Sequence, residues 1–232
     1  PHARLARMDQ DSTAAKGSAF KLLKSIRNRT VDIIVGTQML AKGHDFPSIT
    51  LVGVVCADLS LNLPDFRAGE RTFQLLAQVA GRAGRGSQPG RVIMQTYSPD
   101  HFVIEASRRQ DYLEFFNHEV PFRKALGYPP YTRMIQLKIS GKDLKRVQSH
   151  SKTAAMILKE IMAGDSQGEV QIMGPIEAAV PKISDRYRWQ ILVKGKSATQ
   201  INSLVRQMKA HPLIQGEKSV SIKVDVDPYF LM

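Results

Sequence analysis

The chain reads QVAGRAGR over residues 78–85, directly after an amphipathic run over residues 70–79. On a helix, positions three apart share a face, so the guanidinium groups of Arg82 and Arg85 can converge on one anionic target. An arginine fork matches phosphate oxygens better than a lysine ammonium does. The two glycines of the stretch let a ligand approach the backbone closely. The alternative is a basic glycine turn on a solvated surface.

Three short apolar runs lie around this stretch, at residues 32–35, 51–57 and 91–95, with helical patterns between them. Runs of this kind are typical of strands buried on both faces of a parallel sheet, and their alternation with helices predicts an α/β domain. Ligand sites in such sheets lie at the carboxyl ends of the strands. Thr37 follows the first run and Asp58 follows the second, so both are expected at that edge.

Two further helices are predicted, over residues 14–27 and 98–123. The second carries aromatic side chains at helical spacing, which is typical of core packing; the alternative is stacking on nucleic-acid bases. The stretch GYPP at residues 127–130 ends helical structure and marks a domain junction.

The chain after this junction follows the order β-α-β-β-α-β, which is typical of the ferredoxin-like split βαβ fold. The expected strands are 132–140, 170–181, 186–195 and 219–227, and the expected helices are 144–162 and 198–211.

We therefore predict three parts. Residues 1–100 form a partial α/β lobe with a parallel sheet, residues 101–130 form a helical linker, and residues 131–232 form an α+β domain.

Composition favours a polyanionic partner. The 232 residues carry a formal charge of +12. Of these residues 43% are hydrophobic, which is enough to form hydrophobic cores. Nucleic acid is the first candidate and a membrane surface the second; the alternative is ordinary solubility charge. Cys56 is the single cysteine, which excludes an internal disulfide, and its apolar surroundings predict a small buried side chain.

No Cys/His cluster has zinc-site spacing, and no run has the length of a membrane span or a signal peptide. We expect a cytoplasmic protein that does not act at membranes. The chain lacks an initiator methionine, so we expect it to be a piece of a longer polypeptide.

Residues 35–46, which read VGTQMLAKGHDF, and residues 78–85 together resemble motifs V and VI of the second RecA-like lobe of superfamily 2 helicases. Three further stretches narrow the resemblance: ADLSLNLPDFRAGER at 57–71, GYPP at 127–130 and DVDP at 225–228. With them, almost the whole chain resembles the C-terminal portion of the PriA family, the bacterial replication-restart (primosomal) helicases.

This resemblance implies an ATP-dependent 3′-to-5′ DNA helicase that recognises stalled or branched replication forks and initiates primosome assembly. The implied partners are forked DNA with single-stranded arms, the acidic tail of single-stranded DNA-binding protein, and other primosome proteins of the bacterial nucleoid. Two rivals stay open, namely a RecG-like branch-migration helicase and a non-catalytic module that only binds DNA or a partner.

The resemblance also implies roles for residues near a nucleotide. Arg82 and Arg85 would act as arginine fingers on the γ-phosphoryl group, and Gln78 would lie near the same side of the cleft. Gly43 and Asp45 would lie near the nucleotide sugar. Judged by its residue type alone, Asp45 is equally suited to a turn or a helix cap.

The chain has no Gly-x-x-x-x-Gly-Lys-Ser/Thr loop and no Asp-Glu-x-His box. We therefore expect the half-site for ATP and Mg²⁺ to lie upstream, outside this chain, and the chain alone to hydrolyse ATP negligibly. The zinc-binding cysteines of the PriA family are expected in the missing portion as well.

Two regions of the first half are candidates for binding DNA. Thr37 and Gln38 offer short polar groups and backbone amides to a phosphate. The segment 58–71 is either an ordered loop packed on the sheet or a loop that faces DNA, with Arg67 and Arg71 on phosphates.

A third candidate is the turn between two strands of the second half, where cations and aromatic side chains mix. Its residues are Lys182, Arg186, Tyr187, Arg188 and Trp189. The mixture suits a DNA backbone, a fork base or an acidic amphipathic peptide such as the tail named above. The alternative is an ordinary basic hairpin with Trp189 packed on the core.

Overall fold

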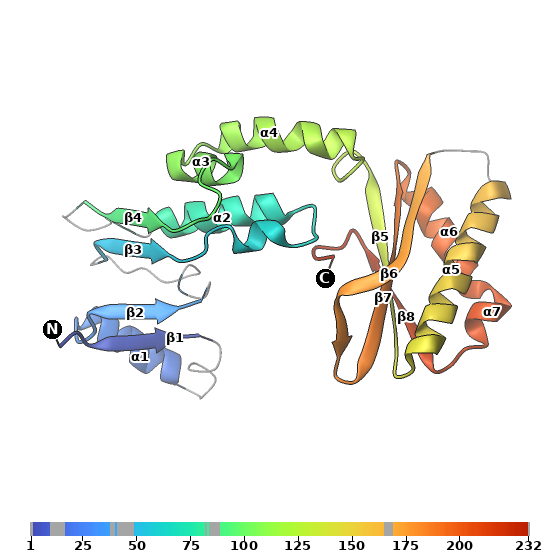
Figure 1. Cartoon of the computed structure of the whole chain (residues 1–232), viewed down its shortest axis with the longest axis horizontal. Coiled ribbons are helices and arrows are strands. Elements are labelled where there is room, and N and C mark those ends of the chain that lie inside the picture. Colours follow the sequence, from blue (N-terminus) through green and yellow to red (C-terminus); the bar gives the residue numbers. More distant parts are fainter. Residues whose placement is uncertain are drawn as a thin grey trace. The chain divides into compact units, whose positions relative to one another are not determined.

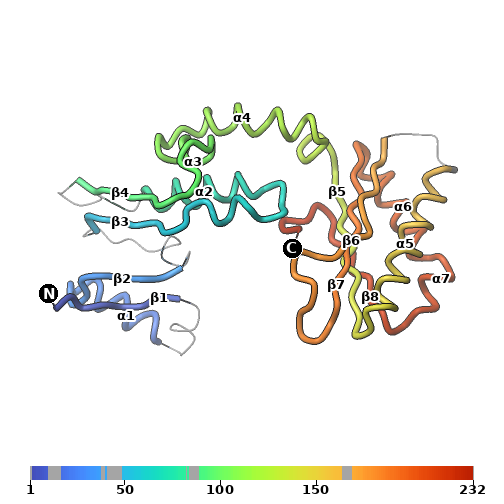
Figure 2. Tube along the Cα trace, viewed as in Figure 1, coloured from blue at the N-terminus to red at the C-terminus, as the bar shows by residue number. Residues whose placement is uncertain are grey.

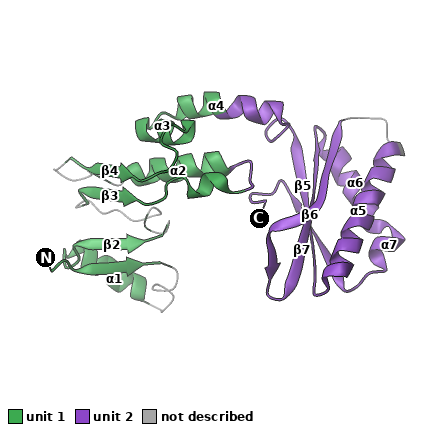
Figure 3. Cartoon of the chain, in the orientation of Figure 1, with its two compact units in different colours: residues 1–63, 68–118 green, residues 64–67, 119–232 purple. Residues whose placement is uncertain are grey.

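The computed structural model describes residues 2–9, 17–37, 40, 49–81, 83, 89–164 and 169–231 (Figure 1). The fold divides into two compact units, which Figure 3 colours separately. The first unit holds residues 1–63 and 68–118, and the second holds residues 64–67 and 119–232. The tetrapeptide 64–67 therefore belongs to the second unit, although segments of the first unit flank it in sequence.

The first unit has the predicted α/β class. Strand β1 pairs parallel with β2, with Leu5 opposite Ile33, and β3 pairs parallel with β4, with Leu51 opposite Arg91. Within the described residues these pairs form two separate two-stranded sheets. The elements are β1 (Leu5–Met8), α1 (Ser18–Arg27), β2 (Ile33–Gly36), β3 (Leu51–Val54), the 3₁₀ helix η2 (Leu59–Asn62), α2 (Ala68–Ala80), β4 (Arg91–Met94), α3 (Phe102–Arg109) and α4 (Tyr112–Ala125).

The prediction that these strands are buried on both faces is wrong for this chain. The side chains of Val35 and Leu51 are each 59% exposed. Strands of a parallel sheet are buried only where helices cover both faces. Around β3 and β4, the described packing comes from Leu76 of α2 and Ile104 of α3, which form one small core beside them. Cys56, expected to be buried, is half-buried in a turn with a positive φ of 52°.

The prediction of one helix over residues 98–123 is also wrong, because the chain forms two helices, α3 and α4. Gln110 ends α3 in the left-handed conformation, with φ 55°. The carboxylate of Asp111 then accepts a 2.9 Å hydrogen bond from the amide of Glu114 in the first turn of α4. An Asp followed three residues later by a Glu is a helix-start signal, so the sequence contained the break.

Phe102 and Phe115 of this region pack in a core, as the first of the two predicted alternatives stated, whereas Tyr112, Phe116 and Phe122 are exposed. Phe115 is buried and stacks on Phe73 of α2 with ring centroids 4.6 Å apart. Phe102, Val103 and Ala106 of α3 belong to the same cluster.

The second unit contains the predicted β-α-β-β-α-β fold, which we call the plait. Its four strands are all antiparallel to their neighbours, in the order β6-β7-β5-β8, and each predicted element lies within two residues of the observed one. The elements are β5 (Arg133–Gly141), α5 (Leu144–Gly164), β6 (Val170–Ile183), β7 (Arg186–Gly195), α6 (Ala198–Ala210), the short α7 (Pro212–Gln215) and β8 (Val220–Val226).

Helices α5 and α6 cover one face of this sheet (Figures 1 and 2). Ile135, Leu137 and Ile139 of β5 belong to the core on that face and are at most 1% exposed. Met134 and Gln136, which alternate with them, are buried on the opposite face. No helix among the described residues is both long enough and apolar enough to cross a membrane.

His150 of α5 is buried, and this burial lowers the pKa of its imidazole, while the nearby charge of Glu217 acts in the opposite direction. The unfolded chain therefore binds a proton more readily than the folded one as pH falls below about 6.5. The stability of the plait should decrease as pH falls through this window. Urea unfolding between about pH 5 and pH 7.5, followed by the fluorescence of Trp189, measures this.

His150→Gln should flatten this pH dependence, since glutamine does not titrate. The same replacement at the exposed His118, outside the plait, serves as the control and should leave the slope unchanged. An unchanged slope in His150→Gln would assign the pH dependence to other groups.

Candidate nucleic-acid interface

Thr37 lies exposed directly after β2, at the carboxyl end of that strand. The strand end is narrow at Gly36, where an added Cβ would lie 2.1 Å from the carbonyl oxygen of Met8 on β1. Only glycine therefore allows β1 and β2 to approach each other here. Thr37 follows this close pairing, and its exposed side chain lies at the carboxyl end of β2, where ligand sites of parallel sheets are expected.

Asp58 lies beyond the end of β3, but its carboxylate is buried rather than presented to a ligand. It accepts hydrogen bonds from the Thr96 hydroxyl at 3.0 Å and the Tyr97 amide at 2.8 Å, which follow β4. Burial raises the pKa of this carboxyl, but these hydrogen bonds outweigh burial and the net pKa is lowered. Asp58 thus braces the carboxyl ends of β3 and β4.

Gln78 lies exposed in the last turn of α2. The opposite face of this helix buries Phe73 and Leu76, so the amphipathic pattern predicted for residues 70–79 is confirmed. The other predicted nucleotide-site residues, and one predicted DNA-binding residue, lie outside the described residues. They are Arg82, Arg85, Gly43, Asp45 and Gln38.

Arg67 lies in the segment predicted to be either a packed loop or a DNA-facing loop. Its guanidinium donates a 2.6 Å hydrogen bond from Nη1 to the carbonyl oxygen of Pro228. Its Cζ lies 4.3 Å from the centroid of the Phe66 ring. These contacts describe a packed loop around Arg67, and a role of Arg67 in binding DNA stays a prediction.

The predicted basic hairpin joins β6 to β7 through Ser184 and Asp185, both with positive φ, as two-residue hairpin turns require. Lys182 is exposed and its Nζ lies 3.0 Å from Oδ1 of Asp185. This hydrogen bond, and secondarily the charge of Asp185, raise the pKa of the Lys182 ammonium. Arg188 donates to the carbonyl oxygen of Val180 at 3.5 Å.

Trp189 packs against the main core of the plait, which is the structural alternative that the sequence left open. Its Nε1 is buried and has no hydrogen-bond partner among the described residues. Lys182 is therefore the exposed member of the hairpin set, whereas Arg186, Arg188 and Trp189 are half-buried.

A basic cavity beside the hairpin was missed from the sequence. It has a volume of about 460 Å³ and is lined by Lys142, Asp143, Arg146, Arg186 and Ser219. Arg186 reaches it from β7 while donating a 2.9 Å hydrogen bond to the carbonyl oxygen of Ser140 on β5. The fold brings the start of α5 next to the hairpin, so three cations from two segments converge there.

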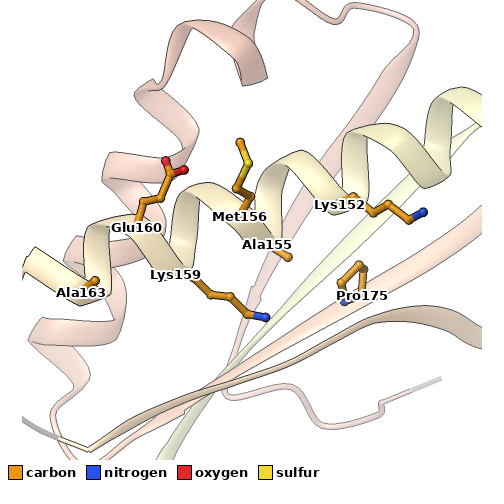
Figure 4. Close-up of a pocket in the computed structure, with 7 residues that line it drawn as sticks. All are labelled: Lys152, Ala155, Met156, Lys159, Glu160, Ala163 and Pro175. Atoms are coloured by element: carbon orange, nitrogen blue, oxygen red, sulfur yellow. The ribbon is translucent and has the colours of Figure 1, made fainter.

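A second cavity, of about 520 Å³, is an apolar groove along α5 (Figure 4). Its lining includes Ala155, Met156 and Pro175, with Lys152 and Lys159 beside them. Figure 4 shows Lys159 reaching toward Pro175 while Met156 points away from it. In the described part of the chain, no group of three or more His, Cys, Asp or Glu side chains is arranged to hold a metal ion.

Two family models match separate parts of the chain. Residues 5–87 match the family described as "Helicase conserved C-terminal domain", and residues 124–229 match "Primosomal protein N C-terminal domain". The first match covers the two parallel strand pairs except β4, and the second covers the plait.

Curated relatives match the chain from end to end. "Replication restart protein PriA" of Bacillus subtilis (strain 168) is 42% identical over 233 residues, which cover 100% of this chain and 28% of that protein. The protein of the same name from Synechocystis sp. is 42% identical over 228 residues, covering 98% and 26%. That of Borreliella burgdorferi is 33% identical over 232 residues, covering 100% and 34%.

The chain therefore spans about a quarter to a third of the length of these relatives. Both matched domains occur here in one chain, and the similarity is continuous across the junction between them. The chain belongs to the PriA family of replication restart proteins.

Proposed function

We propose that this chain is the second motor lobe and C-terminal domain of an ATP-dependent 3′-to-5′ DNA helicase. In this proposal the intact protein recognises stalled or branched replication forks and initiates primosome assembly on nucleoid DNA in the bacterial cytoplasm. The observation that carries the proposal is the match to replication restart proteins over the whole chain, together with the helicase match at residues 5–87.

ATP and Mg²⁺ would be held mainly by the other motor lobe. From this chain, Gln78, Arg82 and Arg85 would face the γ-phosphoryl group, and Gly43 and Asp45 would face the nucleotide sugar. Of these, Gln78 is described, and its exposed position at the end of α2 suits a side chain that reaches a ligand. Bound nucleotide would supply the phosphoryl group, and Arg82 and Arg85 would stabilise the negative charge on its oxygens.

The described residues do not fit zinc, because no suitable cluster of ligands occurs among them. In this proposal, the zinc that the resemblance implies would bind in another part of a longer protein.

DNA would be bound by Thr37, Gln38 and Arg67 in the first half and by Lys182, Arg186, Arg188 and Trp189 at the hairpin. The basic cavity supports this assignment, because Lys142 and Arg146 extend the cationic surface beyond the hairpin. Phosphate contacts of this kind give affinity without reading sequence, which suits recognition of a branched structure. The acidic tail of single-stranded DNA-binding protein would compete with DNA for the same surface.

Replacing Lys142 and Arg146 together with alanine should weaken binding of forked DNA about tenfold and reduce the slope of log K against log[salt] by about 2. The reason is that each cation neutralises one phosphate and releases its counterion. Salt-titrated binding of forked and linear DNA measures both quantities.

The matched control replaces Lys152 and Lys159, two cations of the apolar groove on α5, with alanine. This variant loses the same charge but should keep the slope of the unmodified protein. An equal loss in both double variants would mean that binding follows net charge alone.

The catalytic part of the proposal is tested by complementation. The 232-residue chain alone is expected to hydrolyse ATP negligibly, and adding the remainder of the protein should restore DNA-stimulated hydrolysis. Robust hydrolysis by the chain alone would contradict the division of the nucleotide site between two lobes. No restoration, with DNA binding intact, would favour a non-catalytic binding module.

A further inference from the structure

The face of the plait sheet opposite its helices is covered in part by Leu231. The backbone N–H of this residue donates a 3.0 Å hydrogen bond to Oδ2 of Asp65, and its carbonyl oxygen accepts one of 3.0 Å from Nε2 of Gln136 on β5. Its side chain is buried with those of Met134 and Leu192 on the same face. Leu231 therefore ties Asp65 to the centre of the sheet.

Asp65 is itself buried and uses its two carboxylate oxygens in different directions. While Oδ2 accepts from Leu231, Oδ1 accepts a 2.9 Å hydrogen bond from the backbone N–H of Arg67. A carboxylate bonded to the amide two residues later is typical of the turn that precedes a helix. Helix α2 begins at Ala68, one peptide bond after Arg67.

Two aromatic rings and a cation strengthen this junction. Phe66 stacks on Tyr128 with ring centroids 5.0 Å apart and planes 5° from parallel. The Nζ of the buried Lys194 lies 4.4 Å from the centroid of the Tyr128 ring. Arg67 lies over Phe66 and bonds Pro228, as described above. Polar and aromatic contacts thus hold the tetrapeptide from two separate segments, at Tyr128 and at residues 228–231.

We call this set of residues the clasp. Its members are Asp65, Phe66, Arg67, Tyr128, Pro228 and Leu231.

We propose that the clasp sets the start of α2, and that Asp65 is a positioning residue through which the plait influences the arginine pair, Arg82 and Arg85, which follows that helix in the sequence. Through the arginine pair this inference rests on the proposed helicase function. The physical reason is that the Asp65 carboxylate bonds both to Leu231, which packs on the plait sheet, and to the amide of Arg67, in the turn before α2. A shift of the plait sheet that moves Leu231 also moves the residue that fixes the turn before α2. Helix α2 carries Gln78 in its last turn and leads directly to Arg82.

The first test is hydrogen exchange of residues 68–80 in the 232-residue chain. Asp65→Asn places an amide NH₂ against one of two backbone donors, so the first turn of α2 should exchange about tenfold faster. Asp225→Asn is the matched control, because Asp225 forms a 3.0 Å ion pair with Lys138 on the same sheet but lies outside the clasp. It should leave exchange in α2 unchanged.

The second test uses the intact protein and compares ATPase activity with and without forked DNA. Asp65→Asn should reduce the stimulation by forked DNA about tenfold while DNA affinity changes by less than about twofold. A merely structural role of Asp65 would lower affinity and activity in parallel. Phe66→Leu, which removes the stacking on Tyr128 without touching the carboxylate, should act in the same direction.

Unchanged exchange in α2 together with unchanged fork stimulation would overturn the inference. A loss of protection from hydrogen exchange over the whole plait, in both Asp65→Asn and Phe66→Leu, would also overturn it. The clasp would then be an ordinary part of the plait core. If the intact unmodified protein shows no DNA-stimulated ATPase, the proposed function fails. The exchange comparison still decides in that case whether the clasp sets the start of α2.

Discussion

Replacing Arg85 with alanine in the intact protein should reduce ATP turnover by about 10³-fold or more, the range found when an arginine finger is lost in phosphoryl transfer. Binding of DNA should change by only a few fold. Under the proposed function the guanidinium would stabilise charge that is largest in the transition state, so its loss would affect turnover rather than binding. Single-turnover ATP hydrolysis at saturating DNA, together with salt-titrated DNA binding, measures the two effects separately.

Arg85→Lys serves as the matched variant, because lysine keeps the charge but lacks the planar fork, and it should recover only part of the activity. Arg27→Ala removes an exposed cation from the last turn of α1 and should change neither quantity. Parallel loss of hydrolysis and of DNA affinity in Arg85→Ala would identify Arg85 as a DNA contact instead.

Leu137→Ala should lower the free energy of unfolding of the plait by about 2–5 kcal/mol. Leu137 is fully buried on β5, the strand that pairs with both β7 and β8. The truncated side chain leaves a cavity that α5 and the strands on either side can fill only partly. Trp189 is the single tryptophan of the chain and packs against this core, so its fluorescence in a urea titration reports on the plait.

Val180→Ala is the matched control, because Val180 lies on the edge strand β6 and is 43% exposed. Its unfolding midpoint should remain close to that of the unmodified chain. A loss below about 1 kcal/mol in Leu137→Ala would mean that the core around β5 is loosely packed.

The regular elements of the plait could be predicted from the sequence, because period-2 and period-3.6 patterns depend only on neighbours in the chain. The ranges of its strands and helices follow from these patterns, and the structure confirms them to within two residues. The α/β class of the first unit followed in the same way from apolar runs alternating with helices. The break between α3 and α4 was also encoded locally, at Asp111 and Glu114, and was missed.

Burial of the strands in the first unit could not be predicted in this way. The apolar run at Ile33–Gly36 reads as an interior strand, yet Ile33 and Val35 are exposed on the described surface. An apolar run shows that a strand is suited to burial, but which segments cover it depends on the packing of other parts of the molecule.

The sequence by itself determined the family, the helicase-like motifs and the fold class, since these rest on residue types at short spacings. The tertiary structure alone decided what the polar side chains do. In the folded chain, Asp58 is buried and bonds Thr96, and Lys142 and Arg186 line one cavity. Asp65 bonds Leu231, which lies 166 positions further along the chain. Hydrogen bonds and cavities require side chains to meet in space, and a sequence pattern specifies direction only along its own helix or strand.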